Sequence, residues 1–160
     1  MKPFFPNTEE LWTVRIQYKG KAYLTLCEGW DSDSLLHNDS NILYFLTVED
    51  MENFCETYGF RMDREIWDYD FDTPITNPVD YSRILNNWNL LNTVAKDLGM
   101  FFEGDSKKYN ALYDLLFRLN TPVEPIPPTY RMSEKYYQYI LKVFKKKERF
   151  LNRFVLYQES

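Results

Sequence analysis

The stretch from residue 64 to residue 72 reads Arg64-Glu65-Ile66-Trp67-Asp68-Tyr69-Asp70-Phe71-Asp72. From Trp67 onward, aromatic residues occupy every second position and aspartates fill the positions between them. Successive side chains of a β-strand point to opposite faces, so this alternation predicts a half-buried strand. We expect the aromatic face, Trp67, Tyr69 and Phe71, to point to the core, and the aspartates, Asp68, Asp70 and Asp72, to point outward.

This predicted strand closes the most acidic part of the chain. Residues 28–72 hold thirteen acidic and two basic side chains, a net charge of −11, whereas the whole chain of 160 residues carries −5. The remainder is therefore net positive, at +6. Such an uneven distribution of charge indicates an acidic surface that faces a partner.

The first half of the chain is rich in residues that favour strands. Residues 11–18 and 22–27 flank Lys19-Gly20-Lys21, which predicts a hairpin. Residues 28–41, rich in Asp, Ser and Asn, predict a solvated loop, and 42–46 predict a further strand. Residues 48–58 predict a short helix with Thr47 as its N-cap and Gly59 just after its end.

Apolar residues spaced three and four apart predict helices in the second half. The first follows Asn77-Pro78, an N-cap residue with proline at the first helical position, and ends at Gly99. The second follows Asp105, ends before Pro122, and should pack antiparallel on the first.

Two further segments complete the chain. Residues 121–129 hold four prolines, which predicts an extended connector. The last helix follows Ser133, and its apolar side reaches Phe154. Lysines and arginines of 142–153 predict a solvated basic face, because the sequence pI of about 5.0 argues against direct nucleic-acid binding.

Strands thus dominate the first half and helices the second, without regular alternation. The predicted class is α+β: a small antiparallel sheet of about four strands, mostly in the N-terminal half, covered by about four helices, mostly in the C-terminal half. The length of 160 residues and the apolar fraction of 44% suit a single domain spanning 1–160.

The chain offers few groups for catalysis. Its one histidine, His37, falls in the polar loop and is expected at the surface. Cys27 and Cys55 lack CxxC spacing and are interpreted as reduced core residues, so no zinc ligand set is present. None of the five glycines belongs to a phosphate-binding motif. We therefore expect no enzyme, no catalytic residue, no metal and no cofactor.

The expected compartment is the cytoplasm. The N-terminal residues lack the apolar core of a secretory signal, and no apolar run approaches the roughly 20 residues that span a bilayer. We expect no membrane association.

The chain is small, acidic and rich in aromatic residues. Two segments show this composition most clearly: the strand quoted above and Leu46-Thr47-Val48-Glu49-Asp50-Met51-Glu52-Asn53-Phe54. In this it resembles the immunity proteins of bacterial polymorphic toxin systems, most nearly those of contact-dependent growth inhibition. The resemblance implies a cytoplasmic inhibitor that binds a cognate toxin, often a C-terminal nuclease domain, and covers or blocks its active site.

Charge supports that implication, because a nuclease presents a cationic surface to phosphates and an acidic inhibitor can occupy it. Two alternatives remain open: an acidic adaptor or structural module, and a metal-dependent hydrolase that uses Asp68, Asp70 and Asp72. The expected partner-binding residues are Asp63, Glu65, Trp67, Asp68, Tyr69, Asp70 and Asp72.

Overall fold

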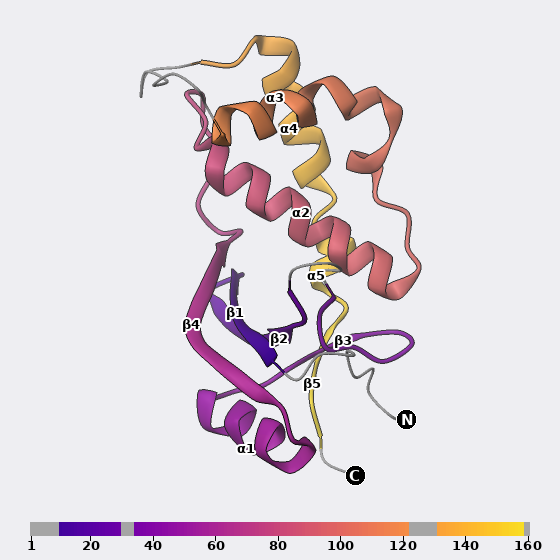
Figure 1. Cartoon of the computed structure of the whole chain (residues 1–160). Helices are drawn as coiled ribbons and strands as arrows, with labels where there is room; N and C mark the ends of the chain where they lie inside the picture. Colours follow the sequence, from indigo (N-terminus) through magenta and orange to yellow (C-terminus); the bar gives the residue numbers. More distant parts are fainter. Residues whose placement is uncertain (1–9, 30–33, 122–130, 159–160) are drawn as a thin grey trace.

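The computed structural model describes residues 10–29, 34–121 and 131–158. These residues form an α+β fold, as the sequence predicts, with strands mainly in the first half and helices mainly in the second (Figure 1). In chain order the strands and α-helices are β1 (Glu10–Tyr18), β2 (Lys21–Cys27), β3 (Ile42–Tyr44), α1 (Val48–Tyr58), β4 (Arg61–Asp70), α2 (Tyr81–Leu98), α3 (Asn110–Asn120), α4 (Glu134–Lys145), α5 (Glu148–Leu151) and β5 (Phe154–Leu156).

The strands form two small sheets. The first has the order β2-β1-β4, and the second pairs β3 with β5. The hairpin of β1 and β2 is antiparallel as predicted, but β4 runs parallel to β1, and β5 runs parallel to β3. The expectation of an antiparallel sheet is therefore correct only for the hairpin. The chain passes through β3 and α1 between β2 and β4, and this long crossover allows β4 to enter beside β1 in the same direction.

Local signals placed α1 correctly. Its N-cap is Thr47, whose side chain accepts a hydrogen bond from the backbone N–H of Asp50. Gly59 follows the helix with φ 77°, and its N–H bonds to the carbonyl of Cys55. A left-handed residue at this position satisfies a helix-end carbonyl, and glycine adopts it without strain.

The predicted start of α2 was wrong. Its N-cap is Asp80, which accepts from the N–H of Arg83, three residues beyond the expected N-cap. Asn77 instead binds the backbone of Met132, donating to its carbonyl and accepting from its N–H, both at 3.0 Å. The side chain of Asn77 therefore joins the segment before α2 to the segment before α4, and the Asn77–Pro78 bond is cis.

The pairing of α2 and α3 follows the prediction. Asn120 at the end of α3 donates to the carbonyl of Tyr81 at the start of α2 (3.1 Å), and Tyr113 donates to Asn89 midway (2.9 Å). These contacts give the two helices an antiparallel order. The proline-rich connector beyond Thr121 lies outside the described residues.

The predicted last helix was too long. Ser133 caps α4 as expected, but α4 ends at Lys145, and the single turn of α5 leads into β5. Phe154 belongs to this strand, where the carbonyl of the preceding residue accepts from the N–H of Ile42 at 2.9 Å. Pairing with a strand far away in sequence overrides the helical spacing of its apolar residues.

The described parts of the predicted loop 28–41, residues 28–29 and 34–41, are less solvated than predicted, and residues 30–33 lie outside the described residues. Leu35 and Leu36 are 1% and 2% exposed, and short bridges connect this segment to β2 and β3. The His37 side chain is 13% exposed and its Nδ1 donates to the carbonyl of Leu35 at 2.7 Å. The expectation of a surface histidine was therefore wrong.

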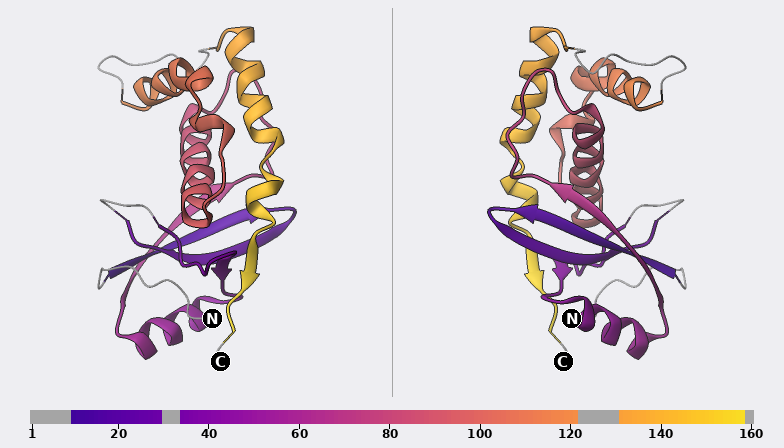
Figure 2. Two further views of the ribbon diagram at one scale, coloured as in Figure 1. Left: turned by 90° about the vertical axis from the view of Figure 1, so that its right-hand side faces the viewer. Right: turned by 90° about the vertical axis from the view of Figure 1, so that its left-hand side faces the viewer.

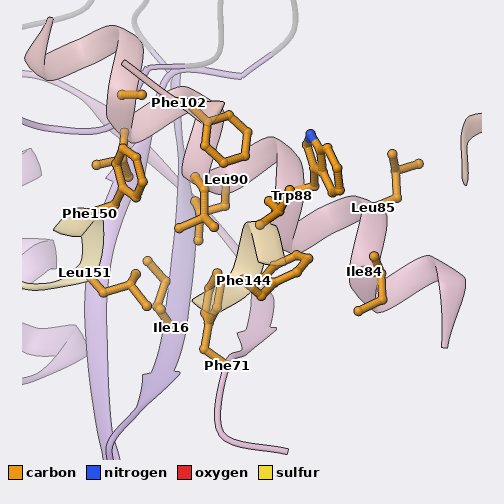
Figure 3. Packing of buried hydrophobic residues seen from close by; sticks show 14 of the residues in the cluster. Ile16, Phe71, Ile84, Leu85, Trp88, Leu90, Phe102, Phe144, Phe150 and Leu151 are labelled. Atoms are coloured by element: carbon orange, nitrogen blue, oxygen red, sulfur yellow. The ribbon is translucent and has the colours of Figure 1, made fainter. Parts of the chain in front are cut away.

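A hydrophobic cluster lies on each face of the three-stranded sheet. Helices α2, α3 and α4 lie on one side of it and α1 on the other (Figure 2). Val14 and Ile16 of β1 contribute to the larger cluster, which centres on Trp88 of α2 and includes residues of α4 and α5 (Figure 3). Leu11 of β1 joins the smaller one, which α1 covers with Phe54. As expected, the two cysteines carry thiols and form no disulfide; Cys55 is buried and Cys27 half-buried.

Candidate functional site at the β4 edge

β4 is the outer strand of the three-stranded sheet, and its far edge pairs with no described strand. Figure 1 shows it curving from the side of α1 to the side of α2. All but one of the predicted partner-binding residues lie on it; Asp72 follows just beyond its end.

The register of β4 confirms the predicted alternation. Trp67 pairs with Val14, so it shares the face of the larger cluster, whereas Asp68 pairs with Arg15 on the opposite face. The predicted burial of the aromatic residues is correct only in part, since Trp67 is 44% exposed. A residue on an outer strand has a neighbour on one side only, which leaves part of its ring in solvent. Tyr69 is half-buried, and Phe71, beyond the strand, is 4% exposed.

Trp67 lies against a second tryptophan. The rings of Trp12 on β1 and Trp67 have centroids 5.3 Å apart with a tilt of 42°. Both rings line a cavity of about 70 Å³ whose other walls include Gly29 and Leu90. The two rings support each other and form one aromatic surface. Tryptophan is among the residues that contribute most to binding energy at protein interfaces.

A bulge shapes the first half of β4. Leu11 of β1 pairs with Met62 and Thr13 pairs with Ile66, so the three residues Asp63 to Glu65 lie opposite one residue of β1. The Asp63 carboxylate accepts from the N–H of Glu65 at 2.8 Å, which closes the bulge. The Glu65 side chain is exposed. Bulges at sheet edges redirect side chains, and this one turns Glu65 to solvent.

Asp68 forms an ion pair across the sheet. Arg15 of β1 donates to both of its oxygens, with Nε at 2.5 Å and a terminal nitrogen at 3.0 Å. Hydrogen bonding to Asp68 raises the pKa of Arg15. The side chains are 43% and 59% exposed, so the pair contributes little to stability but fixes the orientation of the carboxylate.

Asp70 organises the chain that leaves β4. It accepts from the hydroxyl and N–H of Thr73 and from the N–H of Asp72. The hydroxyl of Thr73 makes the largest contribution to lowering the pKa of Asp70. These bonds form a turn of the chain and leave Asp70 less available to a partner than the sequence suggests.

Asp72 is likewise engaged within the protein. It accepts from the backbone N–H of Lys19 at 2.6 Å and of Gly20 at 2.9 Å, in the turn between β1 and β2. The bond from Gly20 contributes most to lowering the pKa of Asp72. The three aspartates of the quoted stretch therefore have three different sets of partners, and among the described residues no group of three potential ligands is placed to hold a metal ion.

The site residues that sequence-based prediction did not identify lie on β1. Trp12 and Arg15 lie beside β4 only because β4 pairs in parallel with β1, some 50 residues earlier. No local pattern in the sequence carries that pairing.

Comparison with known proteins shows a likeness of fold. No family model and no curated protein sequence matches the chain. Among solved structures, the C-terminal domain of SatS, solved in complex with bromine, is similar to it with a TM-score of 0.57. The two are 13% identical, and the likeness covers 92% of this chain and 94% of the other. No helix in the described part of the chain is both long and apolar enough to cross a membrane. The TM-score, over most of both chains, shows that this chain shares its fold with the SatS C-terminal domain.

Proposed function

We propose that this protein binds another protein through the β4 edge, and that it acts in the cytoplasm as the immunity protein of a toxin of the contact-dependent growth inhibition kind. The single observation that carries the proposal is Trp67, a large apolar side chain that remains 44% exposed on an outer strand. Exposed aromatic side chains at rigid sites are typical anchors of interfaces.

The surroundings of Trp67 favour a cationic partner. Glu65 and Asp68, on either side of it in sequence, are both exposed, and Asp68 is held by Arg15. A toxin domain that binds nucleic acid presents basic side chains, so carboxylates around an aromatic anchor would steer its approach. Helix α1, on the other side of the sheet from the Trp67 ring, adds further exposed carboxylates near the same strand, namely Glu49, Asp50 and Glu56.

The partner surface is smaller than the sequence suggests. Asp70 and Asp72 hold internal hydrogen bonds and Asp68 is paired with Arg15, so the proposed contact residues reduce to Trp67 and Glu65, with the half-buried Tyr69 on the same face as Trp67. The hydrolase alternative gains no support from the arrangement of Asp68, Asp70 and Asp72, because in the described part of the chain they form no group of three possible ligands for a metal ion.

The proposal predicts a toxin gene immediately upstream of this one, and the experiment is co-expression of this protein with the toxin domain that such a gene encodes. We expect growth to be rescued and the two proteins to copurify. Trp67→Ala should weaken the complex by about 2 kcal/mol or more in calorimetry, the size typical of an anchor residue. The matched control is Phe117→Ala, because Phe117 is an aromatic residue on α3 that is 54% exposed.

Three outcomes would contradict the proposal. Rescue that survives Trp67→Ala with unchanged affinity would place the interface elsewhere. A complex with a protein that is not toxic, without growth rescue, would favour the adaptor alternative. Equal losses in Trp67→Ala and Phe117→Ala would show that the aromatic anchor is not specific.

A further inference from the structure

A second site lies away from the free edge of β4. A cavity of about 230 Å³ lies between the segment that joins β4 to α2 and the last turns of α4. Its apolar walls are Phe71, Pro74, Ile75, Leu141 and Phe144. Figure 3 shows Phe71 and Phe144 next to each other at this end of the core, with ring centroids 6.4 Å apart.

Three cations also line this cavity: Arg83, Lys145 and Lys147. Arg83 donates to backbone carbonyls of the connecting segment, including that of Thr73 at 3.0 Å, and Lys147 donates to the carbonyl of Phe71 at 3.1 Å. In the described part of the chain none of the three forms an ion pair with a carboxylate. The charges of Arg83 and Lys147 therefore face neutral carbonyl groups, and none of the three cations is neutralised by an ion pair with a described carboxylate.

The nearby carboxylates face other groups. Asp72 lines the cavity, but its oxygens accept the backbone N–H groups of the β1–β2 turn. The charge of Arg83 is a minor cause of the lowered pKa of Asp70. The carboxylate oxygens of Asp70 accept hydrogen bonds from Thr73 and Asp72 instead. The lining thus carries three cations against one engaged carboxylate.

A buried acceptor completes the site. Asn87 lines the cavity and is 2% exposed; its amide nitrogen donates to the carbonyl of Asp70 at 2.8 Å. This bond fixes the orientation of the amide, and the oxygen Oδ1 has no hydrogen-bond partner among the described groups. Buried polar atoms in native proteins are nearly always hydrogen-bonded, so Oδ1 of this lining residue retains the capacity to accept a hydrogen bond from a molecule that enters the cavity.

We propose that this cavity binds a small organic anion, with an apolar body between Ile75, Leu141 and Phe144 and an acidic group against Lys145 and Lys147. An O–H or N–H of the ligand satisfies Asn87. Ligand sites commonly combine apolar walls with a few converging polar groups in this way. The volume corresponds to roughly eight water molecules of about 30 Å³ each, which suits one substituted ring. The inference does not depend on the protein partner proposed above.

The test is a titration of the full chain, labelled with ¹⁵N, with phenyl phosphate in low salt. We expect shifts to concentrate on the backbone of 71–75 and 145–147 and on the side-chain amide of Asn87. Binding should be about tenfold tighter than that of benzyl alcohol, which lacks the charge, and than that of inorganic phosphate, which lacks the ring.

Variants separate the cavity from the basic face of α4. Lys145→Gln combined with Lys147→Gln should weaken phenyl phosphate binding about tenfold, and Leu141→Trp, which fills the cavity without removing charge, should abolish it. Lys142→Gln is the matched control, because Lys142 lies on the same helix, is exposed and does not line the cavity. Circular dichroism confirms that each variant is folded.

The proposal is overturned if phenyl phosphate shifts signals over all lysine-bearing surfaces alike, or if Lys142→Gln weakens binding as much as the double variant. Equal affinity for inorganic phosphate would refute the apolar part of the site. Retained binding in folded Leu141→Trp would refute the cavity as its location.

Discussion

The Asp72 carboxylate accepts a hydrogen bond of 2.6 Å from the backbone N–H of Lys19, 53 residues earlier in the chain. Lys19 and the next residue, Gly20, have φ values of 51° and 72°, so both lie in the left-handed region that a two-residue hairpin turn requires. This conformation is unfavourable for lysine. The carboxylate supports it by accepting the N–H groups of both turn residues.

We therefore predict that Asp72→Asn destabilises the protein at pH 7. Asparagine has one acceptor oxygen and no charge, so the turn loses part of its support. Because the pKa of Asp72 is lowered in the folded state, its carboxylate stabilises the protein above the unfolded pKa of about 4, and this contribution is lost as the pH falls through the folded-state pKa. Urea unfolding at pH 7 and pH 3 should show a difference from wild type that shrinks on acidification. Glu56→Gln, an exposed change on α1, serves as the control, and a constant difference at both pH values would refute the role of charge.

The Trp88 side chain should be the most costly aromatic to remove. It is 2% exposed and its ring contacts those of Phe102, Tyr109, Tyr113 and Phe144. Trp88→Ala should lower the free energy of unfolding by about 3–5 kcal/mol, the cost of a large cavity in a core. Denaturant unfolding measures it. Phe117→Ala, on the exposed side of α3, should stay within about 0.5 kcal/mol, and similar losses in both would mean that the core does not centre on Trp88.

Gly29 is predicted to be intolerant of a side chain. Its φ is 65°, and a Cβ at this position would overlap Nε1 of Trp12. Gly29→Ala must therefore shift the Trp12 ring, and with it the contact to Trp67, in addition to a backbone cost of about 1–2 kcal/mol. Tryptophan fluorescence and thermal unfolding report the two effects. Gly20→Ala has a similar φ and open space around the new Cβ, so it should show the backbone cost alone. Unchanged fluorescence in Gly29→Ala would argue against the close approach.

The two cysteines should differ in reactivity. Burial raises the pKa of Cys55 to about 11, so almost none of it is thiolate at pH 8, and its sulfur is also shielded. Cys27 is half-buried and should be alkylated by iodoacetamide first. Peptide mass spectrometry over a time course measures both rates. Modification of Cys55 at the rate of Cys27 in the native protein would show that the smaller cluster opens readily, and a urea-unfolded sample gives the upper limit for each.

The sequence was most reliable where a structure depends on neighbouring residues. The turn at Gly20, the caps of α1 at Thr47 and Gly59, and the alternation of β4 are local signals, and the structure agrees with them. The parallel pairing of β4 with β1 is not local, so the exposure of Trp67 and the partner of Asp68 could not be read from the pattern. The alternation correctly assigned faces but not the internal hydrogen bonds that engage the aspartates.

Misplaced elements have similar causes. Phe154 continues the helical spacing of α4, and only its pairing with β3 makes it part of a strand. Leu35 sits in a polar stretch and is buried because β2 and the segment around it form a bridge. Asn77 was a sound N-cap by local chemistry, but the backbone of Met132 competes for its side chain. In each case a distant partner outweighs the local preference.

The pairing of β3 with β5 also constrains the order in which the fold can be completed. Ile42 and Phe154 are separated by about 110 residues, so closing that loop has an entropic cost that only the assembled helices between them can reduce. During synthesis β3 leaves the ribosome long before its neighbour exists, and its outer hydrogen-bonding groups stay in water until the final strand arrives. The β1–β2 hairpin and α1 can form early, whereas the pairing of β3 with β5, which joins the two halves of the chain, forms last.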